Sequence, residues 1–311
     1  MVAEDKDYDI VIIGAGPAGL SAGLYAARGR HKTLLVEKNV TGGQIALTAV
    51  IENYPGIPEI NGFDLGQVMQ QQAEKYGLEM AYTFVTSITP DGKYHIVHTD
   101  DGDYRAKAVI ITAGADYNHL NVPGEERLTG YGVSYCATCD AAFFADQEVA
   151  VVGGGDSALD EGLFVTRYAS KVTVIHRREE LRAGAYLQER AFNEPKMEFL
   201  WNTVVESVEG ETDVDKLKVR NVVTNEVSDF PVSAVFIFIG HSPNSSFIDQ
   251  LVEMDAGRHI VVNEWMETNV PGIYAAGDIR TNSARQVISS AGDGATAAIA
   301  ADHYITNKFK S

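Results

Sequence analysis

The chain has 311 residues, of which 45% are hydrophobic and 22% charged, as expected for a globular protein long enough to form two domains. Its formal net charge of −18 argues against nucleic acid or an anionic membrane surface as a partner. No apolar run reaches the ~18 residues that a membrane helix needs, and the acidic N-terminus lacks the basic and apolar regions of a signal peptide. We therefore expect a cytoplasmic protein that does not enter the membrane.

The first 37 residues follow the pattern of a dinucleotide-binding β-α-β unit. A β-branched apolar run at 8–13 predicts a buried parallel strand, and the Ala- and Leu-rich segment after it predicts a helix that ends near Arg28. A second strand is expected at 33–36, directly before Glu37. Between the first strand and the helix stands Gly-Ala-Gly-Pro-Ala-Gly, the glycine-rich loop of such a unit.

The glycines of this loop have separate physical roles. Gly14 permits the tight turn, Gly16 lets a pyrophosphate approach the backbone, and Gly19 allows the helix to pack closely on the strand. The helix N-terminus faces the phosphates, and Glu37 can bind a ribose hydroxyl. The candidate residues of this first site are Gly14, Gly16, Pro17, Ala18, Gly19 and Glu37.

The same pattern recurs in the middle of the chain. Strands are expected at 148–152 and 171–175, a glycine-rich turn at 153–158, and a helix from Asp160 to about Ala169. Alanine stands where the third glycine would be, which the fingerprint tolerates. The chain therefore carries two dinucleotide-binding patterns.

The second pattern differs from the first in the charge that follows its second strand. Three arginines cluster there in place of a carboxylate, and guanidinium groups pair with a 2′-phosphate that a carboxylate would repel. NADPH is therefore preferred over NADH, although two neighbouring glutamates leave open a merely solvated helix start. The candidate residues of this second site are Gly153, Gly155, Asp156, Ser157, His176, Arg177, Arg178 and Arg182.

The C-terminal segment completes the first dinucleotide site rather than the second. A strand that finishes at Asp278 is expected, and residues 285–294 lead into an Ala-rich helix at 295–301. The predicted fold class is α/β, with two Rossmann-like dinucleotide-binding domains, the second inserted into the first. Proline- and glycine-containing linkers near 118–130 and 240–244 predict the boundaries. The first domain would span 1–117 together with 246–311, and the inserted second domain would span 118–245.

The only two cysteines, Cys136 and Cys139, form a C-x-x-C motif in the inserted domain, with Asp140 directly after it. Such a motif alone could bind zinc or be buried and inert, but a four-ligand zinc site lacks a second pair here. Between two dinucleotide patterns the pair is interpreted as a redox-active disulfide. Asp140 is a candidate proton donor and acceptor for thiol exchange, or a helix N-cap, and the two roles are compatible.

Taken together, these motifs resemble the low-molecular-weight thioredoxin reductases, flavoprotein disulfide reductases of about this length. The resemblance spans almost the whole chain in the family's order. The matching stretches are Gly14–Gly19, Gly42–Gln44, Glu52–Gly56, Cys136–Asp140, Gly153–Ala158, His176–Arg178 with Arg182, Gly240–Pro243, Gly277–Asp278 and Arg285–Gln286.

The resemblance implies FAD on the first domain, NADPH on the second, thioredoxin or a thioredoxin-like protein as the disulfide substrate, and a homodimer. It also implies that Cys139 faces the flavin, that Cys136 attacks the substrate, and that the inserted domain rotates between the half-reactions. Arg285 would lie at the flavin or merely at the dimer surface. The residues implied for flavin binding are Gly43, Gln44, Asn53, Gly277, Asp278, Arg285 and Gln286.

Two short departures from the family pattern do not touch the cysteines. Ala141 and Ala142 follow Asp140 where Gly-Phe is common, and Thr112-Ala-Gly114 replaces the usual Ala-Thr-Gly order. Other functions remain open at this point. The chain could reduce a glutaredoxin-like or other small redoxin, take electrons from a donor other than NADPH, or only sense nucleotides.

Overall fold

A computed structural model describes residues 6–48 and 50–309. The chain forms two compact units, one from Met1–Asp116 with Ser242–Ser311 and one from Tyr117–His241. The sequence predicted that the chain leaves the first unit after residue 117 and returns to it after residue 245. In the structure it leaves after Asp116, one residue earlier, and returns after His241, four residues earlier. The difference at the second crossing has a backbone cause, because Asn244 N–H donates to Gly114 O at 3.0 Å and ties this segment to the first unit.

The first unit has a seven-stranded sheet in the order β3-β2-β1-β6-β5-β4, with β17 also paired to β6. Its strands are β1 (Asp7–Ile13), β2 (Thr33–Glu37), β3 (Glu79–Tyr82), β4 (Val85–Asp91), β5 (Tyr94–Thr99), β6 (Gly102–Ile111) and β17 (Ile273–Ala275). Its helices are α1 (Pro17–Arg28), α2 (Gly62–Glu74) and α6 (Val287–Lys308), and its 3₁₀ turns are η2 (Gly43–Leu47), η4 (Ser246–Ile248) and η5 (Gly277–Ile279).

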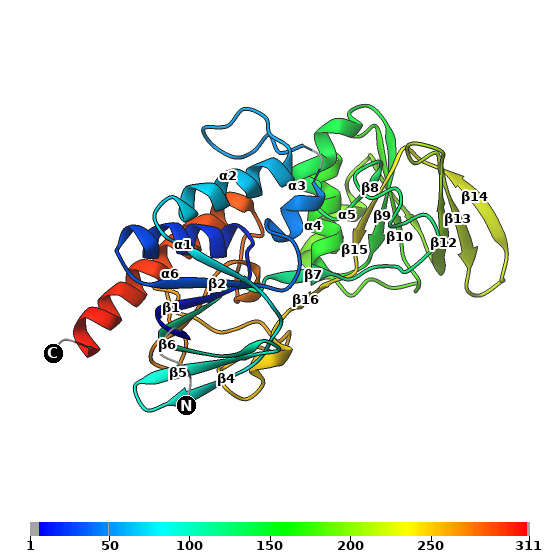
Figure 1. The fold of residues 1–311 in the computed structure, drawn as a ribbon. Helices are drawn as coiled ribbons and strands as arrows, with labels where there is room; N and C mark the ends of the chain where they lie inside the picture. The colour runs from blue at the N-terminus through cyan, green and yellow to red at the C-terminus, as the bar shows by residue number, and fades with distance from the viewer. Residues whose placement is uncertain (1–5, 49, 310–311) are drawn as a thin grey trace. The chain divides into compact units, whose positions relative to one another are not determined.

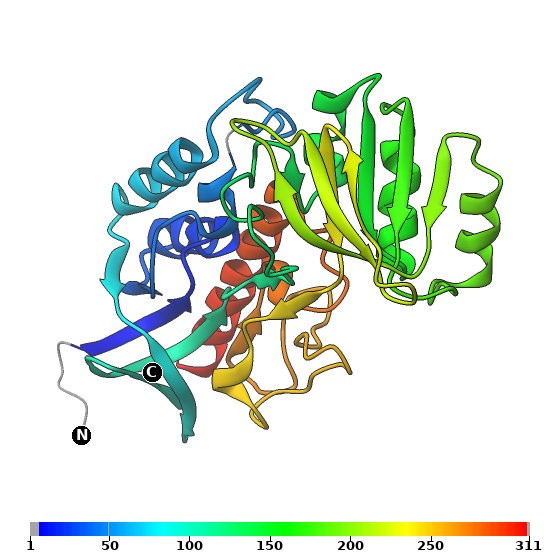
Figure 2. The same ribbon diagram turned by 90° about the vertical axis from the view of Figure 1, so that its right-hand side faces the viewer.

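Strand β1 is buried on both faces, so its apolar residues alternate between two cores. Ile10 and Ile12 pack with α1 and α6, which lie side by side in both views (Figures 1 and 2). Val11 and Ile13 pack on the other face against residues of β4, β5 and the segment around Ile248. Strand β1 lies in the parallel part of this mixed sheet, and both of its faces are thus covered, which explains the continuous apolar run in the sequence.

The second unit has a parallel sheet in the order β11-β10-β9-β15-β8 and a separate antiparallel sheet, β12-β13-β14. Its strands are β8 (Val133–Ser134), β9 (Glu148–Gly153), β10 (Lys171–Ile175), β11 (Met197–Leu200), β12 (Thr203–Glu209), β13 (Lys216–Asn221), β14 (Val227–Pro231) and β15 (Ala234–Phe238). Its helical segments are α3 (Ala137–Asp140), η3 (Ala141–Phe144), α4 (Asp156–Val165) and α5 (Ala185–Phe192).

The chain passes between the units twice, in two segments that pair with each other. These are β7 (Ala115–Tyr117) and β16 (His241–Pro243), which form a two-stranded sheet. Each unit therefore keeps its own sheets and cores, and the connection is short.

Several element boundaries differ from the sequence prediction, and helices α4 and α6 end at Val165 and Lys308 rather than near 169 and 301. Helix α4 begins at Asp156, not Asp160, because Leu159 N–H already bonds to Gly155 O. Helix α6 begins at Val287, not 295, because Gln286 and Ser289 form a capping box. The last strand ends at Ala275, and Asp278 lies in η5 beyond it. Across the described residues, no helix combines the length and apolar character required to cross a membrane.

Candidate active site

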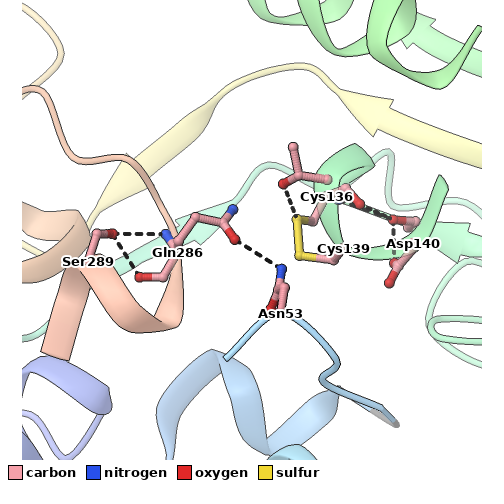
Figure 3. Close-up of a disulfide and its surroundings, with 8 residues drawn as sticks. Asn53, Cys136, Cys139, Asp140, Gln286 and Ser289 are labelled. Carbon is pink, nitrogen blue, oxygen red and sulfur yellow. Dashed lines mark hydrogen bonds between the residues drawn. A yellow bond between two sulfur atoms is a disulfide. The ribbon is translucent and has the colours of Figure 1, made fainter. Parts of the chain in front are cut away.

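The two cysteines form a disulfide at the start of α3 (Figure 3). Cys136 occupies the N-cap position, and Cys139 lies one turn further on, with 5.3 Å between their Cα atoms. Cys139 is exposed and Cys136 is half-buried. The hydroxyl of Thr138, between them, lies 3.4 Å from Cys136 Sγ. A short helical turn therefore brings both sulfurs within bonding reach and leaves at least one accessible for exchange.

Asp140 is held beside this disulfide by a buried serine. The Ser134 hydroxyl donates to Asp140 Oδ2 at 2.6 Å, and Cys136 N–H donates to Ser134 Oγ at 3.1 Å. Burial raises the pKa of the Asp140 carboxyl above its ordinary value, and the Ser134 hydrogen bond opposes that rise. Asp140 occupies the N-cap position of η3, but among the described residues its side chain makes no capping hydrogen bond to that turn. A carboxyl with a raised pKa next to a disulfide is suited to exchange protons with leaving thiolates.

The glycine-rich loop of the first unit has the geometry of a phosphate cradle. A Cβ on Gly14, whose φ is +108°, would meet Thr112 O at 2.5 Å, and one on Gly19 would meet Gly14 O at 1.9 Å. A Cβ on Gly16, the N-cap of α1, would enter open space, with Pro17 following at the first helical position. Gly14 and Gly19 are thus packed tightly against the protein backbone, whereas the space beside Gly16 is empty. Phosphate oxygens could reach the helix amides from that empty side.

Glu37, at the end of β2, is buried and bound to backbone amides. Its Oε2 accepts from Ala15 N–H and its Oε1 from Asn39 N–H, each at 2.7 Å. This carboxylate fixes the glycine-rich loop, and each of its oxygens keeps a lone pair with which to accept a further hydrogen bond.

Asp278 lies in η5 with its carboxylate largely desolvated. Ser283 Oγ donates to Asp278 Oδ1 at 2.7 Å, and burial raises the pKa of Asp278 despite the opposing charge of Arg285. Gly277 is fixed from the other side, because its N–H donates to Asp293 Oδ2 at 3.1 Å. Ala18 of α1 lies directly beneath, since a Cβ on Gly277 would meet the Ala18 Cβ at 3.0 Å.

The remaining polar residues of the first unit come together in two pairs. Asn53 Nδ2 donates to Gln286 Oε1 at 3.2 Å (Figure 3), and Gln44 Nε2 donates to Asp116 Oδ1 at 2.7 Å. Gly43 lies against the glycine-rich loop, because a Cβ on it would meet Gly16 Cα at 3.3 Å. Segments around residues 16, 43, 53, 278 and 286 thus converge within one unit, while Arg285 is exposed.

The glycine-rich turn of the second unit repeats this arrangement. Gly155 is the N-cap of α4, and a Cβ on it would enter open space. Asp156 Oδ1 accepts from Gly184 N–H at 2.6 Å, so this carboxylate also holds the loop that follows the arginines. Ser157 is exposed in the first turn of α4.

The basic cluster surrounds His176. This histidine is buried against Gly154, its Nε2 lies 3.1 Å from Glu180 O, and burial lowers its pKa, so the ring is neutral. Arg182 N–H donates to Gly154 O at 2.7 Å, which places this arginine at the turn. The arginines at 177, 178 and 182 are exposed, and within the part of the chain that the structure describes none of their guanidinium groups forms an ion pair.

Four residues that support these sites belong to none of the sequence motifs. Ser134 holds Asp140, Thr112 donates to Ile13 O and Gly14 O, and Asp293 pairs with Arg280. For Ser134 the sequence offered one signal, its position two residues before the first cysteine. In the residues described, no group of three or more His, Cys, Asp or Glu side chains is arranged to hold a metal ion.

Comparison with known proteins agrees with this geometry. The family model described as pyridine nucleotide-disulphide oxidoreductase matches residues 8–297. A thioredoxin reductase of Bacillus subtilis is 46% identical over 305 residues, covering 98% of this chain and 96% of the relative.

Two solved structures are each 44% identical to the chain. The thioredoxin reductase from Streptococcus pyogenes superposes with a TM-score of 0.95 and covers 98% of this chain and 100% of its own. The Lactococcus lactis thioredoxin reductase in its FR conformation has a TM-score of 0.66, with 96% and 99% covered. The chain belongs to the low-molecular-weight thioredoxin reductases of the pyridine nucleotide-disulphide oxidoreductase family, flavoproteins that use FAD and NADPH.

Proposed function

We propose that this chain is an NADPH-dependent thioredoxin-disulfide reductase, which converts NADPH, a proton and a partner disulfide into NADP⁺ and a partner dithiol. One observation carries the proposal. The only cysteines form a disulfide beside a half-buried carboxyl, within a unit that has its own nucleotide-binding turn and is inserted into a second such unit. Neither nucleotide site alone would require a dithiol.

The first unit is proposed to bind FAD. Its glycine-rich loop is open where a Cβ on Gly16 would project, and the buried Asp278 carboxylate retains free lone pairs for hydroxyl donors. The chemistry that bound FAD supplies is the relay of an electron pair from NADPH to the disulfide. The residues proposed to hold it are Gly14, Gly16, Pro17, Ala18, Gly19, Glu37, Gly43, Gln44, Asn53, Gly277, Asp278, Arg285 and Gln286.

The second unit is proposed to bind NADPH. The α4 N-terminus at Gly155 is open for a pyrophosphate, and Arg177, Arg178 and Arg182 offer exposed guanidinium groups for the 2′-phosphate. Gly153, Asp156, Ser157 and His176 shape the turn. Because His176 is buried and neutral, it supports the turn rather than adding charge.

The dithiol is proposed to reduce the partner by thiol–disulfide exchange. The Cys136 thiolate attacks one partner sulfur, forming a mixed disulfide and releasing the other partner sulfur as a thiolate, which takes a proton. The Cys139 thiolate then attacks Cys136 Sγ, which restores the Cys136–Cys139 bond and releases the reduced partner. Asp140 is placed to give and take the protons that these steps require.

The inserted unit is proposed to rotate between the two half-reactions. Both crossings lie in the short β7–β16 pair, so a change of backbone angles there could turn one unit as a body. The two solved relatives support this, because at equal identity they match the chain with TM-scores of 0.95 and 0.66. A cross-link that fixes the units in one orientation should stop turnover and leave one half-reaction. Full turnover would reject the rotation.

The physiological partner is proposed to be thioredoxin or a thioredoxin-like protein. The enzyme is proposed to be a homodimer that acts in the cytoplasm. The partner is named from the relatives, and the location from the dithiol, which must work where thiols are kept reduced. Sedimentation of the purified protein tests the dimer, and a mass equal to one chain contradicts it.

Anaerobic titration of the yellow protein tests the donor and the acceptor together. NADPH should bleach the flavin absorbance, NADH should do so more weakly, and oxidised thioredoxin should restore the colour. A Cys139→Ser variant should keep FAD but lose thioredoxin reduction. No bleaching by NADPH would reject the donor, and recovery only with a glutaredoxin-like protein would replace the acceptor.

A further inference from the structure

Ser134 joins the two functional parts of the C-x-x-C-D turn. It lies in β8, is only 3% exposed, and its hydroxyl contacts both Asp140 and the backbone of Cys136. Asp140 N–H also donates to Cys136 O at 3.2 Å. The result is a closed ring of hydrogen bonds from the carboxyl, through one hydroxyl, to the backbone of the first cysteine.

The donors and acceptors in this ring can be counted. A serine hydroxyl has one proton to donate and two lone pairs. Cys136 N–H occupies one lone pair permanently, because an amide cannot reverse its hydrogen bond. The hydroxyl proton therefore has two acceptors within reach, Asp140 Oδ2 at 2.6 Å and Cys136 O at 3.3 Å.

These two acceptors correspond to the two protonation states of Asp140. An ionised carboxylate can only accept, so Ser134 must donate to it, and the short O···O distance is typical of a charge-assisted bond. A protonated Asp140 can donate to the second lone pair of Ser134, while the serine proton turns to Cys136 O. In both states every polar atom of the buried ring keeps a partner, which avoids the cost of an unsatisfied group.

We propose that Ser134 is a positioning residue for thiol exchange, whose hydroxyl fixes the Asp140 carboxyl and reverses its hydrogen bond each time that carboxyl gains or loses a proton. The proposal rests on the function proposed above, in which Asp140 handles the protons of exchange. Without the hydroxyl, burial would act on Asp140 unopposed and keep it protonated to a higher pH.

The Ser134 hydrogen bond, rather than a neighbouring charge, opposes the rise that burial causes in the Asp140 pKa. Helix α4, which packs against α3, carries Asp156, Asp160 and Glu161, and η3 has no titratable side chain. None of these carboxylates contributes to the shift of the Asp140 pKa, which arises from burial and is opposed by Ser134 alone. Loss of the hydroxyl should therefore move this pKa in one direction, upward.

The test compares the holoenzyme with Ser134→Thr and Ser134→Val, which share a shape and differ by a hydroxyl. Each protein is reduced with dithiothreitol, freed of it, and its exchange rate with 5,5′-dithiobis(2-nitrobenzoate) is measured across pH. Asp140→Asn identifies the limb of the profile that depends on this carboxyl. Thr166→Val, which removes another buried hydroxyl of the same unit, is the control.

In Ser134→Val the Asp140-dependent limb should move to higher pH by about 1–2 units, because a hydrogen bond to an ionised group is lost. In Ser134→Thr and Thr166→Val it should stay within about 0.5 unit of the parent. Equal shifts in the Thr and Val variants, or no shift in either, would overturn the proposal. If Ser134→Val does not fold, Ser134→Ala takes its place, with the same upward shift expected and the same outcomes overturning the proposal.

This readout uses neither NADPH nor thioredoxin. If the proposed function is wrong, the parent enzyme will not transfer electrons from NADPH to thioredoxin, yet the pH profile of its dithiol exchange rate will still respond to the Ser134 variants as expected. Failure of the Ser134 proposal would appear as an active parent enzyme whose profile does not respond to the hydroxyl.

Discussion

Arg280 and Asp293 form a two-point ion pair inside the first unit. Arg280 Nε donates to Asp293 Oδ2 at 2.6 Å and its Nη2 donates to Oδ1 at 2.8 Å, with side chains only 15% and 10% exposed. The same carboxylate accepts from Gly277 N–H. Helix α6 is therefore held to the turn that contains Asp278, so this pair sets the position of a residue proposed to bind the flavin.

Removing one partner of this pair should unfold part of the proposed flavin site. Asp293→Ala removes the carboxylate that pairs with the largely buried Arg280 and leaves the Gly277 amide without its acceptor, so the free energy of unfolding should fall by about 3 kcal/mol. Urea unfolding measures this, and flavin retained after gel filtration should fall with it. Asp249→Ala, which removes the exposed pair with Arg258, should cost less than about 1 kcal/mol. Equal losses in the two variants would contradict the assignment.

Two glycines of the same loop should respond differently to alanine. In Gly16→Ala the added Cβ enters open space, so the apoprotein should keep its free energy of unfolding within about 0.5 kcal/mol while its FAD affinity drops. In Gly19→Ala the Cβ would lie 1.9 Å from Gly14 O, and this overpacking should destabilise the apoprotein itself by about 1–3 kcal/mol. Urea unfolding without flavin and flavin titration separate the two. An unstable Gly16→Ala apoprotein would argue against an open cradle.

The arginine cluster should determine which nicotinamide cofactor is used. Arg177→Ala with Arg178→Ala should raise KM for NADPH by about 10- to 100-fold, since charge-assisted bonds to the 2′-phosphate are lost. KM for NADH should hardly change, because NADH lacks that phosphate. Steady-state rates with both cofactors check this. Arg190→Ala, an exposed arginine of α5, should behave as the parent. A parallel rise for both cofactors would instead indicate a damaged turn.

Asp278 should make the apoprotein less stable as pH rises. Burial raises its folded-state pKa above 3.8, so between pH 3.8 and that raised pKa the folded protein holds a proton that the unfolded chain has released. Stability therefore falls as pH rises through this window, and the full cost persists above it. Asp278→Asn should be more stable than the parent at pH 7, and the gain should shrink as pH falls toward 4. Urea unfolding of both apoproteins at several pH values measures the difference, and a gain that does not depend on pH would contradict it.

The motifs that could be recognised from the sequence are those whose chemistry is local. The position of Gly14 follows from a turn that only a positive φ can close, and the Cys136–Cys139 spacing from what one helical turn can bridge. Helix starts were less predictable. The α4 N-cap is Gly155, which has no side chain to mark the position by a capping hydrogen bond, and the α6 start depends on a Gln–Ser box outside the usual pattern.

The supporting residues could not be predicted because their contacts depend on how strands pair or on partners distant in the sequence. Ser134 is an ordinary serine until β8 pairs with β15, where Ser134 aligns with Phe236, and turns its hydroxyl toward Asp140. Asn53 and Gln286 meet across 233 residues.

The amino-acid sequence alone determined two nucleotide-binding turns, a dithiol between them and the charge that favours NADPH, because each depends on the steric or electrostatic nature of neighbouring residues. Only the tertiary structure decided which buried side chains hold Asp140 and Asp278 in place. The Ser134–Asp140 and Ser283–Asp278 partners are only 6 and 5 residues apart in the sequence, but the carboxyls lose water only when the surrounding strands and helices pack, and no short stretch of sequence encodes that packing.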